Sequence, residues 1–250
     1  MNPHFDRIGH FRVLVIGRSK AGKTTLLQRV CNSTELSEVT NSKGGKIDPT
    51  VVQGSLEGHV NIEDEIIFQS NPGFIFHDSR GFEAGSEDEV KLMKKFVAER
   101  AAALILEQRI HVIWYCIPLT DYDRPIMPAE ELFFNECNIA NVPVIVVLTK
   151  ADAMELVAIG QLRDEGLAMK EAKLRAGELT TEILNKLKTR IEAQLAGFKY
   201  PPKDCMNKDQ ADCNPLLRCT VDALDEKELQ KLVMSTQRIN FVLNIEFTIR

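Results

Sequence analysis

Eight consecutive residues near the start of the chain have the types and the spacing of a phosphate-binding loop. They run from Gly17 to Thr24, read GRSKAGKT and fit the pattern G-x-x-x-x-G-K-S/T. Glycines at the two fixed positions permit a tight turn whose backbone amides point inward at an anion. In such a loop Lys23 would reach the β- and γ-phosphate oxygens, and the Thr24 hydroxyl would be a ligand for Mg²⁺. The predicted nucleotide-binding residues here are Gly17, Arg18, Ser19, Lys20, Ala21, Gly22, Lys23, Thr24 and Thr25.

The segments on either side of this loop supply the elements that it requires. The apolar run 13–16 predicts a buried strand that ends at Gly17, and a helical pattern begins at Thr24. The alternative is an ordinary turn between a strand and a helix. Because strand, glycine-rich loop and helix start follow one another in the required order, the pattern favours a loop that binds a nucleoside phosphate.

A second segment carries an aspartate at the tip of a strand. The predicted strand 74–76 leads into HDSRG, which ends in a D-x-x-G arrangement. Asp78 is expected to hold Mg²⁺ through water, and the Gly81 amide is expected to meet the γ-phosphate. D-x-x-G alone is a common pattern. It gains weight here because it follows a phosphate-binding loop and an intervening strand.

A third segment follows another buried strand. The apolar run 142–148 predicts a central strand that delivers TKAD, Thr149 to Asp152, to the same edge of the sheet. T-K-x-D downstream of the other two motifs resembles the guanine-recognition motif of translation-factor-related GTPases. The run IPLTDYDRPIMPAEELFF adds a looser likeness to septin-like GTPases. Taken alone, TKAD is also compatible with a helix N-terminus that has Asp152 in its first turn.

The resemblance implies roles for single residues. In that family the carboxylate, here Asp152, accepts hydrogen bonds from guanine, and the stem of the lysine, here Lys150, packs along the base. The most frequent form has Asn where this chain has Thr149. The family also has a guanine-contacting loop after the last strand. With the last strand predicted at 216–219, Val221 falls in that loop.

The resemblance also assigns a role within the polar segment 31–57. A threonine of this segment reaches Mg²⁺ and the γ-phosphate in such switch proteins. Thr50 is the candidate and Thr40 the reserve, and the alternative is that Thr50 is a plain turn residue beside Pro49. The predicted metal ligands are thus Thr24, Thr50 and Asp78, and the predicted catalytic residues are Lys23 and Thr50.

The implied fold is α/β: a three-layer G domain with a mostly parallel central sheet, helices on both faces and a helical insertion before the last strand. We expect one such domain over residues 1–250. The insertion is expected at 155–214, because the distance to the predicted last strand exceeds what a strand–helix–strand step requires. The implied function is binding of Mg²⁺–GTP, with Mg²⁺ as cofactor, and slow hydrolysis to GDP and phosphate as a molecular switch.

The expectation of slow hydrolysis rests on Phe82. Ras-like relatives carry a water-orienting Gln at this position, and a phenyl ring cannot orient water by a hydrogen bond. Two alternatives stay open, namely a nucleotide-gated binding module with negligible hydrolysis and an ATPase. Candidate cations for transition-state charge are Arg18, Lys20, Arg80 and Arg124.

Composition limits the partners. A net charge of −5 without a Lys/Arg-rich run argues against a nucleic-acid surface, and no apolar run is long enough for a membrane span. Six scattered cysteines without zinc-type spacing are typical of free thiols, so we expect a cytoplasmic protein. The expected partners are GTP or GDP and an unidentified protein effector or regulator. The resemblance adds a homodimer through the nucleotide face as a further candidate.

Overall fold

The computed structural model describes residues 9–33, 38–40, 45–47, 61–79, 87–137, 139, 141–207 and 213–236. Five residues discussed above lie outside this part of the chain: Pro49, Thr50, Arg80, Gly81 and Phe82.

The centre of the molecule is a sheet to which the described residues contribute eight strands, in the order β3-β2-β4-β5-β1-β6-β7-β8. The strands are β1 (Phe11–Gly17), β2 (Glu38–Thr40), β3 (Lys46–Ile47), β4 (Glu65–Ile67), β5 (Phe74–Asp78), β6 (Val112–Pro118), β7 (Val144–Thr149) and β8 (Asp204–Asn207). From β5 to β8 all neighbours are parallel, whereas β4, β2 and β3 extend the sheet by antiparallel pairs. Parallel strands end at one edge, so the loops after β1, β5 and β7 collect there.

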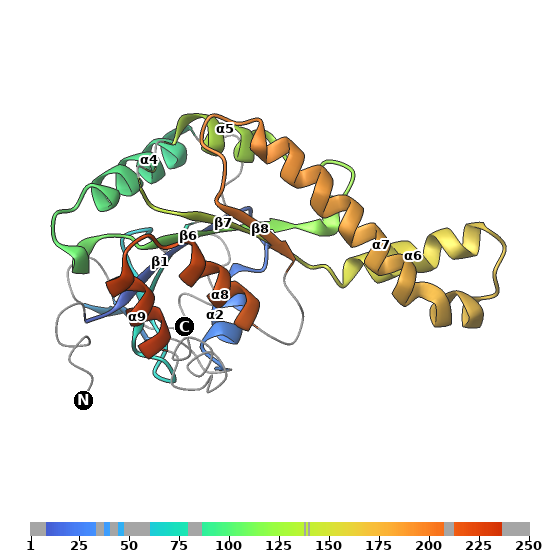
Figure 1. Cartoon of the computed structure of the whole chain (residues 1–250), viewed down its shortest axis with the longest axis horizontal. Helices are drawn as coiled ribbons and strands as arrows, with labels where there is room; N and C mark the ends of the chain where they lie inside the picture. Colours follow the sequence, from blue (N-terminus) through green and yellow to red (C-terminus); the bar gives the residue numbers. More distant parts are fainter. Residues whose placement is uncertain are drawn as a thin grey trace.

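Helices cover both faces of the sheet (Figure 1). They are α2 (Lys23–Val30), α4 (Glu87–Ala101), α5 (Pro128–Glu136), α6 (Ala153–Asp164), α7 (Met169–Ala196), α8 (Asn214–Ala223) and α9 (Lys227–Thr236), with short 3₁₀ turns η1 (Leu106–Gln108) and η2 (Leu119–Asp121). Successive side chains of β1 point to opposite faces of the sheet. Val13 and Val15 pack in a core with α2, α8 and α9, and Leu14 and Ile16 pack in a core with α4, α5 and α7. The predicted three-layer α/β fold is confirmed.

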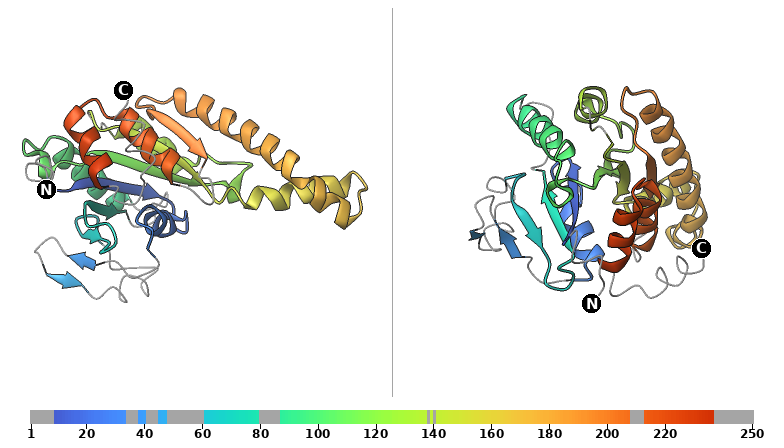
Figure 2. Two further views of the ribbon diagram at one scale, coloured as in Figure 1. Left: turned by 60° about the horizontal axis from the view of Figure 1, so that its bottom comes forward. Right: turned by 60° about the vertical axis from the view of Figure 1, so that its left-hand side comes forward.

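α6 and α7 form a helical hairpin that projects beyond the edge of the sheet where β7 ends (Figures 1 and 2). The inner half of α7 packs on the sheet through the buried apolar side chains of Leu187, Ile191 and Leu195. Nearer the tip, each helix buries small side chains such as Ala158 and Ala172. A helical insertion before the last strand is therefore confirmed. Neither these helices nor any other helix in the described part of the chain combines the length and apolarity needed to cross a membrane.

The position predicted for the last strand is wrong. In the described part of the chain the last strand is β8, which pairs in parallel with β7, and residues 216–219 lie in helix α8. Pro215 stands in the first turn of α8, where its missing N–H leaves no hydrogen bond unmade. The expected insertion range 155–214 consequently contains a strand. The buried residues of α8 recur with helical spacing: Leu216, Leu217, Thr220 and Val221.

Residues 88–108 do not form one continuous helix. α4 ends at Ala101, and the separate turn η1 follows. Leu104 is 98% exposed and Ile105 is 55% exposed. The apolar residues between α4 and η1 therefore do not continue the buried face of the helix.

Candidate nucleotide-binding site

The phosphate-binding loop follows β1 and depends on its two fixed glycines. Gly17 has φ 153°, and a Cβ there would lie 2.5 Å from the carbonyl oxygen of Cys116 on the neighbouring strand β6. Gly22, with φ 82°, is the left-handed N-cap of α2. The loop can therefore leave the sheet and enter the helix only with glycine at these two positions.

Lys23 joins the loop to the second predicted segment. Its ammonium is largely buried and donates to the carbonyl oxygens of Gly17 at 3.1 Å and Arg18 at 3.2 Å. The same Nζ lies 4.0 Å from Oδ1 of Asp78. The contact arises because β5 pairs with β1 and sets Asp78 opposite Val15, two residues before the loop.

The surroundings of the Asp78 carboxylate are suited to binding a cation. Burial raises the pKa of its carboxyl to about 6, although the Lys23 ammonium acts in the opposite direction. Its Oδ1 is buried and accepts no hydrogen bond from the described residues. Thr24 supplies an exposed hydroxyl in the first turn of α2. An orphaned carboxylate oxygen and a hydroxyl suit a hard cation such as Mg²⁺, so Thr24 and Asp78 fit the expected metal. The third predicted ligand, Thr50, lies outside the described residues.

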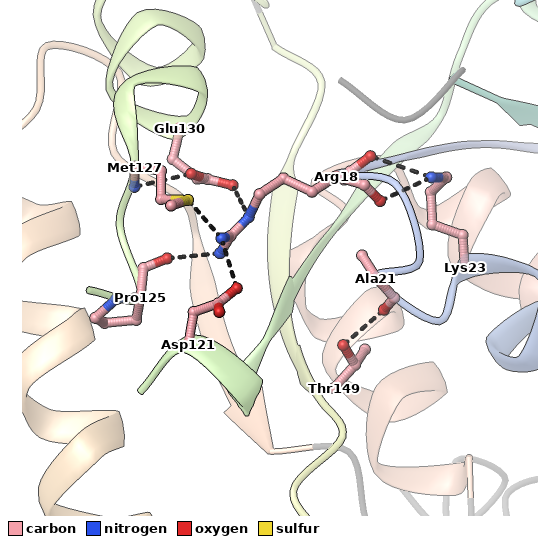
Figure 3. A network of polar contacts seen from close by, with 9 residues as sticks. Arg18, Ala21, Lys23, Asp121, Pro125, Met127, Glu130 and Thr149 are labelled. Carbon is pink, nitrogen blue, oxygen red and sulfur yellow. Dashed lines mark hydrogen bonds and ion pairs between the residues drawn. The ribbon is translucent and has the colours of Figure 1, made fainter. Parts of the chain in front are cut away.

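Thr149 brings the third segment to the loop. Its hydroxyl donates to the carbonyl oxygen of Ala21 at 2.7 Å, and the residue is only 2% exposed (Figure 3). The hydroxyl thus ties the end of β7 to the phosphate-binding loop. Although Thr149 stands where the most frequent form of the motif has Asn, it still makes a hydrogen bond between these two loops.

Lys150 and Asp152 follow directly. Lys150 has φ 57°, a left-handed backbone that is costly for a residue with a side chain and often marks a functional loop. Asp152 is exposed at the N-cap of α6, where its carboxylate makes no capping hydrogen bond. Asp152 does begin a helix, as the alternative interpretation of TKAD had it, but its carboxylate is not used to cap that helix.

The other predicted residues lie in different surroundings. Ser19, Lys20 and Thr25 are exposed, and Lys20 has φ 58°. Val221 is not in a loop: it is 3% exposed within α8. The residues that follow β8, 208–212, lie outside the described part of the chain.

The side chain of Arg18 points away from Lys23, toward the residues after β6 and the start of α5 (Figure 3). Its Nη1 donates to Asp121 Oδ2 at 3.2 Å and to Met127 Sδ at 2.7 Å, and its Nη2 donates to the carbonyl oxygen of Pro125 at 2.9 Å. Its Nε lies 3.1 Å from Glu130 Oε1. In this arrangement the guanidinium does not serve as a cation for transition-state charge, which corrects that expectation.

Sequence reasoning did not identify Glu130 or Asp121 as neighbours of the site. Glu130 lies three residues after Met127, whose backbone N–H donates to Glu130 Oε2 at 2.9 Å. That spacing indicates a helix start. No local pattern indicates that the second carboxylate oxygen faces an arginine from the phosphate-binding loop, more than a hundred positions earlier.

Similar structures are distant from this chain in sequence. One is described as the crystal structure of a mutation variant of SsGBP, with 12% identity, a TM-score of 0.45, and coverage of 91% of this chain and 56% of that chain. This chain thus spans little more than half of that structure's length. Another is a septin GTPase domain from Chlamydomonas reinhardtii, with 18% identity, a TM-score of 0.42, and coverage of 88% of this chain and 71% of that chain.

A comparison with curated proteins finds no match. A family described as 50S ribosome-binding GTPase matches residues 12–150. The match begins in β1 and ends at Lys150, so it includes the phosphate-binding loop, Asp78 and the start of the TKAD segment. Since these residues make up more than half of the chain, the protein belongs to this family of P-loop GTPases.

Proposed function

We propose that the protein binds Mg²⁺–GTP and hydrolyses it slowly to GDP and phosphate as a molecular switch. The observation that carries the proposal is the meeting of three segments at one loop. Lys23 bonds to the carbonyls of the loop and faces Asp78, while Thr149 bonds to the carbonyl of Ala21. Membership of a GTPase family supports GTP as the ligand.

Each segment then has a distinct task. The loop amides and the N-terminus of α2 hold the phosphates, and Lys23 offsets their charge. The Asp152 carboxylate accepts from guanine N1 and from the exocyclic amine, which adenine cannot supply. Thr24, Asp78 and, from the sequence, Thr50 would hold Mg²⁺, which when bound neutralises charge on the phosphate oxygens.

The guanine assignment is tested by Asp152→Asn. Because the amide would no longer accept from both guanine donors, GTP affinity should fall at least about 100-fold and binding of xanthosine triphosphate should appear. Titration of both nucleotides against purified protein measures this. Asp164→Asn, at the far end of α6, is the matched control and should bind GTP normally. Unchanged GTP affinity in Asp152→Asn, or ATP binding equal to GTP, would contradict the assignment.

The rate of hydrolysis separates the switch enzyme from a nucleotide-gated binding module. Phe82 offers no group to orient the attacking water, which favours a low rate and keeps the module as the second candidate. The phosphate count of the nucleotide that co-purifies with the protein, followed by single-turnover measurement of bound GTP, distinguishes them. Slow release of phosphate is the expected result, and none over hours would favour the module.

The protein is proposed to be cytoplasmic and to act with a protein partner. The six cysteines all lie in the described residues and none is joined in a disulfide, which suits a cytoplasmic protein. An effector or regulator would respond to the nucleotide state. A homodimer across the nucleotide face is one candidate assembly, and measurement of molecular mass with bound GDP and with a non-hydrolysable GTP analogue tests it.

A further inference from the structure

The contacts of Arg18 carry an inference beyond nucleotide binding itself. Its side chain is 10% exposed, and its main partner Glu130 is fully buried. The guanidinium contacts three further residues: Asp121, Pro125 and Met127. A residue of the phosphate-binding loop is thus fastened by its side chain to the segment after β6 and to the first turn of α5 (Figure 3).

Stability alone does not account for this arrangement. Burying an ion pair removes two charges from water, and only good hydrogen-bond geometry recovers the cost. Here Arg18 Nε and Glu130 Oε1 lie 3.1 Å apart, yet neither atom makes a hydrogen bond within the described residues. The buried hydroxyl of Tyr115, whose ring packs on Phe133 of α5, also lacks a partner among them. Replacement of a buried ion pair by well-packed apolar residues of similar volume is often neutral or stabilising.

The backbone of Arg18 has a direct connection to the phosphate-binding machinery. Its carbonyl oxygen accepts from Lys23 Nζ at 3.2 Å and from the Ala21 N–H at 3.1 Å. A rotation of this peptide would therefore move the acceptor that orients the Lys23 ammonium. The Arg18 side chain thus holds the residue against the start of α5, and its carbonyl oxygen accepts the hydrogen bond that orients Lys23.

We propose that Arg18 is a positioning residue: anchored on Glu130 and the segment Asp121–Met127, it fixes the peptide carbonyl that aims Lys23 at the phosphates. The inference rests on the proposed function, because it assigns Arg18 a task in holding GTP and GDP. It predicts that the anchor affects nucleotide dissociation separately from its effect on folding.

A set of variants separates these two effects. Arg18→Met leaves the Glu130 carboxylate buried without its partner, and Glu130→Gln leaves the buried Arg18 guanidinium with only the half-exposed Asp121 carboxylate. Each should therefore lower the melting temperature of the nucleotide-free protein. The double variant has no buried charge left in the pair and should recover most of that loss. Its dissociation rate for a fluorescent GDP should nevertheless stay about tenfold faster than that of the unaltered protein, because the anchor is still absent.

Arg18→Lys is the second test and does not depend on the double variant. It keeps a charge opposite Glu130 but cannot bridge the same set of acceptors as the guanidinium fork. We expect a melting temperature near that of the unaltered protein with faster GDP dissociation. Glu99→Gln removes one charge from the exposed Lys95–Glu99 pair of α4 and is the matched control, with no effect on dissociation.

The outcomes are distinct. If dissociation recovers together with melting temperature in the double variant, or is unchanged in Arg18→Lys, the anchor is merely structural and the inference is overturned. Should the double variant not fold, the Arg18→Lys rate decides. If the unaltered protein binds no GDP in the same assay, the proposed function fails, and the inference fails with it.

Discussion

Thr149 illustrates how one hydroxyl links two binding loops. Its bond to the carbonyl oxygen of Ala21, at 2.7 Å, is buried and joins the end of β7 to the phosphate-binding loop. A Cβ added at Gly22 would lie 3.8 Å from Thr149 Cβ, so any side chain at position 22 would touch Thr149. The usual Asn of related GTPases is longer, and at this separation the shorter threonine side chain suffices.

Removal of the Thr149 hydroxyl should lower the affinity for GTP. Thr149→Val keeps the shape but leaves the Ala21 carbonyl without its donor, so GTP affinity should fall by about three- to tenfold. Thr149→Ser should bind almost normally. Thr180→Val is the matched control, because Thr180 donates to the Ala176 carbonyl at 2.7 Å on the hairpin, away from the loop. Equal affinity in Thr149→Val and the unaltered protein would mean that this bond does not contribute to binding.

At the scale of elements, two buried histidines fix the start of β1. The Arg12 N–H donates to His111 Nδ1 at 3.0 Å, so His111 Nε2–H donates to the carbonyl oxygen of Leu106 at 2.9 Å. Arg12 Nη1 likewise donates to His77 Nε2 at 3.2 Å, and it pairs with Glu65 at 2.6 Å. Burial lowers the pKa of both histidines to about 4. Both rings are therefore neutral, with tautomers set by their partners.

The consequence is a loss of stability in mild acid. Above pH 6.5 His111 is neutral in both states. Below it the unfolded chain takes up a proton at His111 that the folded protein excludes until about pH 4, so this histidine alone should lower the free energy of unfolding by about 3 kcal/mol over this interval. In His111→Asn, Oδ1 can accept from the Arg12 N–H without titrating, so the decline should be shallower. Urea unfolding at a series of pH values measures the difference, and parallel curves for the two proteins would contradict it.

The elements also show what the sequence could and could not predict. Strands β1 and β7 contain the apolar runs 13–16 and 142–148 and are predicted close to their observed bounds, because burial on both faces imposes that pattern. β8 reads Asp-Cys-Met-Asn and lies at the edge of the sheet, so it carries no such run. The segment 216–219, Leu-Leu-Arg-Cys, resembles a short strand, although Pro215 and the recurrence at Thr220 and Val221 indicate the helix that forms.

The same distinction applies to the site. The phosphate-binding loop, Asp78 and TKAD are local patterns, and the parallel sheet alone suffices to bring them together. The anchor of Arg18 on Glu130 joins residues far apart in sequence through packing of α5, and no local spacing encodes it. Groups defined by tertiary contact are therefore visible only in the structure.

At the scale of the whole molecule, one segment contacts both the phosphate-binding loop and the projecting hairpin. Pro125 accepts from Arg18, and the carbonyl oxygen of Asp123, two residues earlier, accepts from Arg190 Nη2 of α7 at 2.6 Å. Tyr122 and Ile126 pack against the core that includes the inner half of α7. A displacement of the hairpin by a bound partner would therefore reach Arg18 through residues 121–127.

This connection predicts that Arg190 and Arg18 are energetically coupled although they do not touch. Arg190→Ala should speed GDP dissociation, because it removes the hydrogen bond that holds the segment at Asp123. The effect should be only about two- to threefold, because an exposed hydrogen bond contributes little free energy. In Arg18→Met the segment 121–127 no longer contacts the phosphate-binding loop through the Arg18 guanidinium. Adding Arg190→Ala to this variant should therefore not change the GDP dissociation rate further. Lys186→Ala, which removes an exposed Lys186–Glu182 pair from α7, is the control and should leave the rate unaltered. Additive effects of Arg190→Ala and Arg18→Met would show that the hairpin acts on the nucleotide independently of Arg18, or only through the fold as a whole.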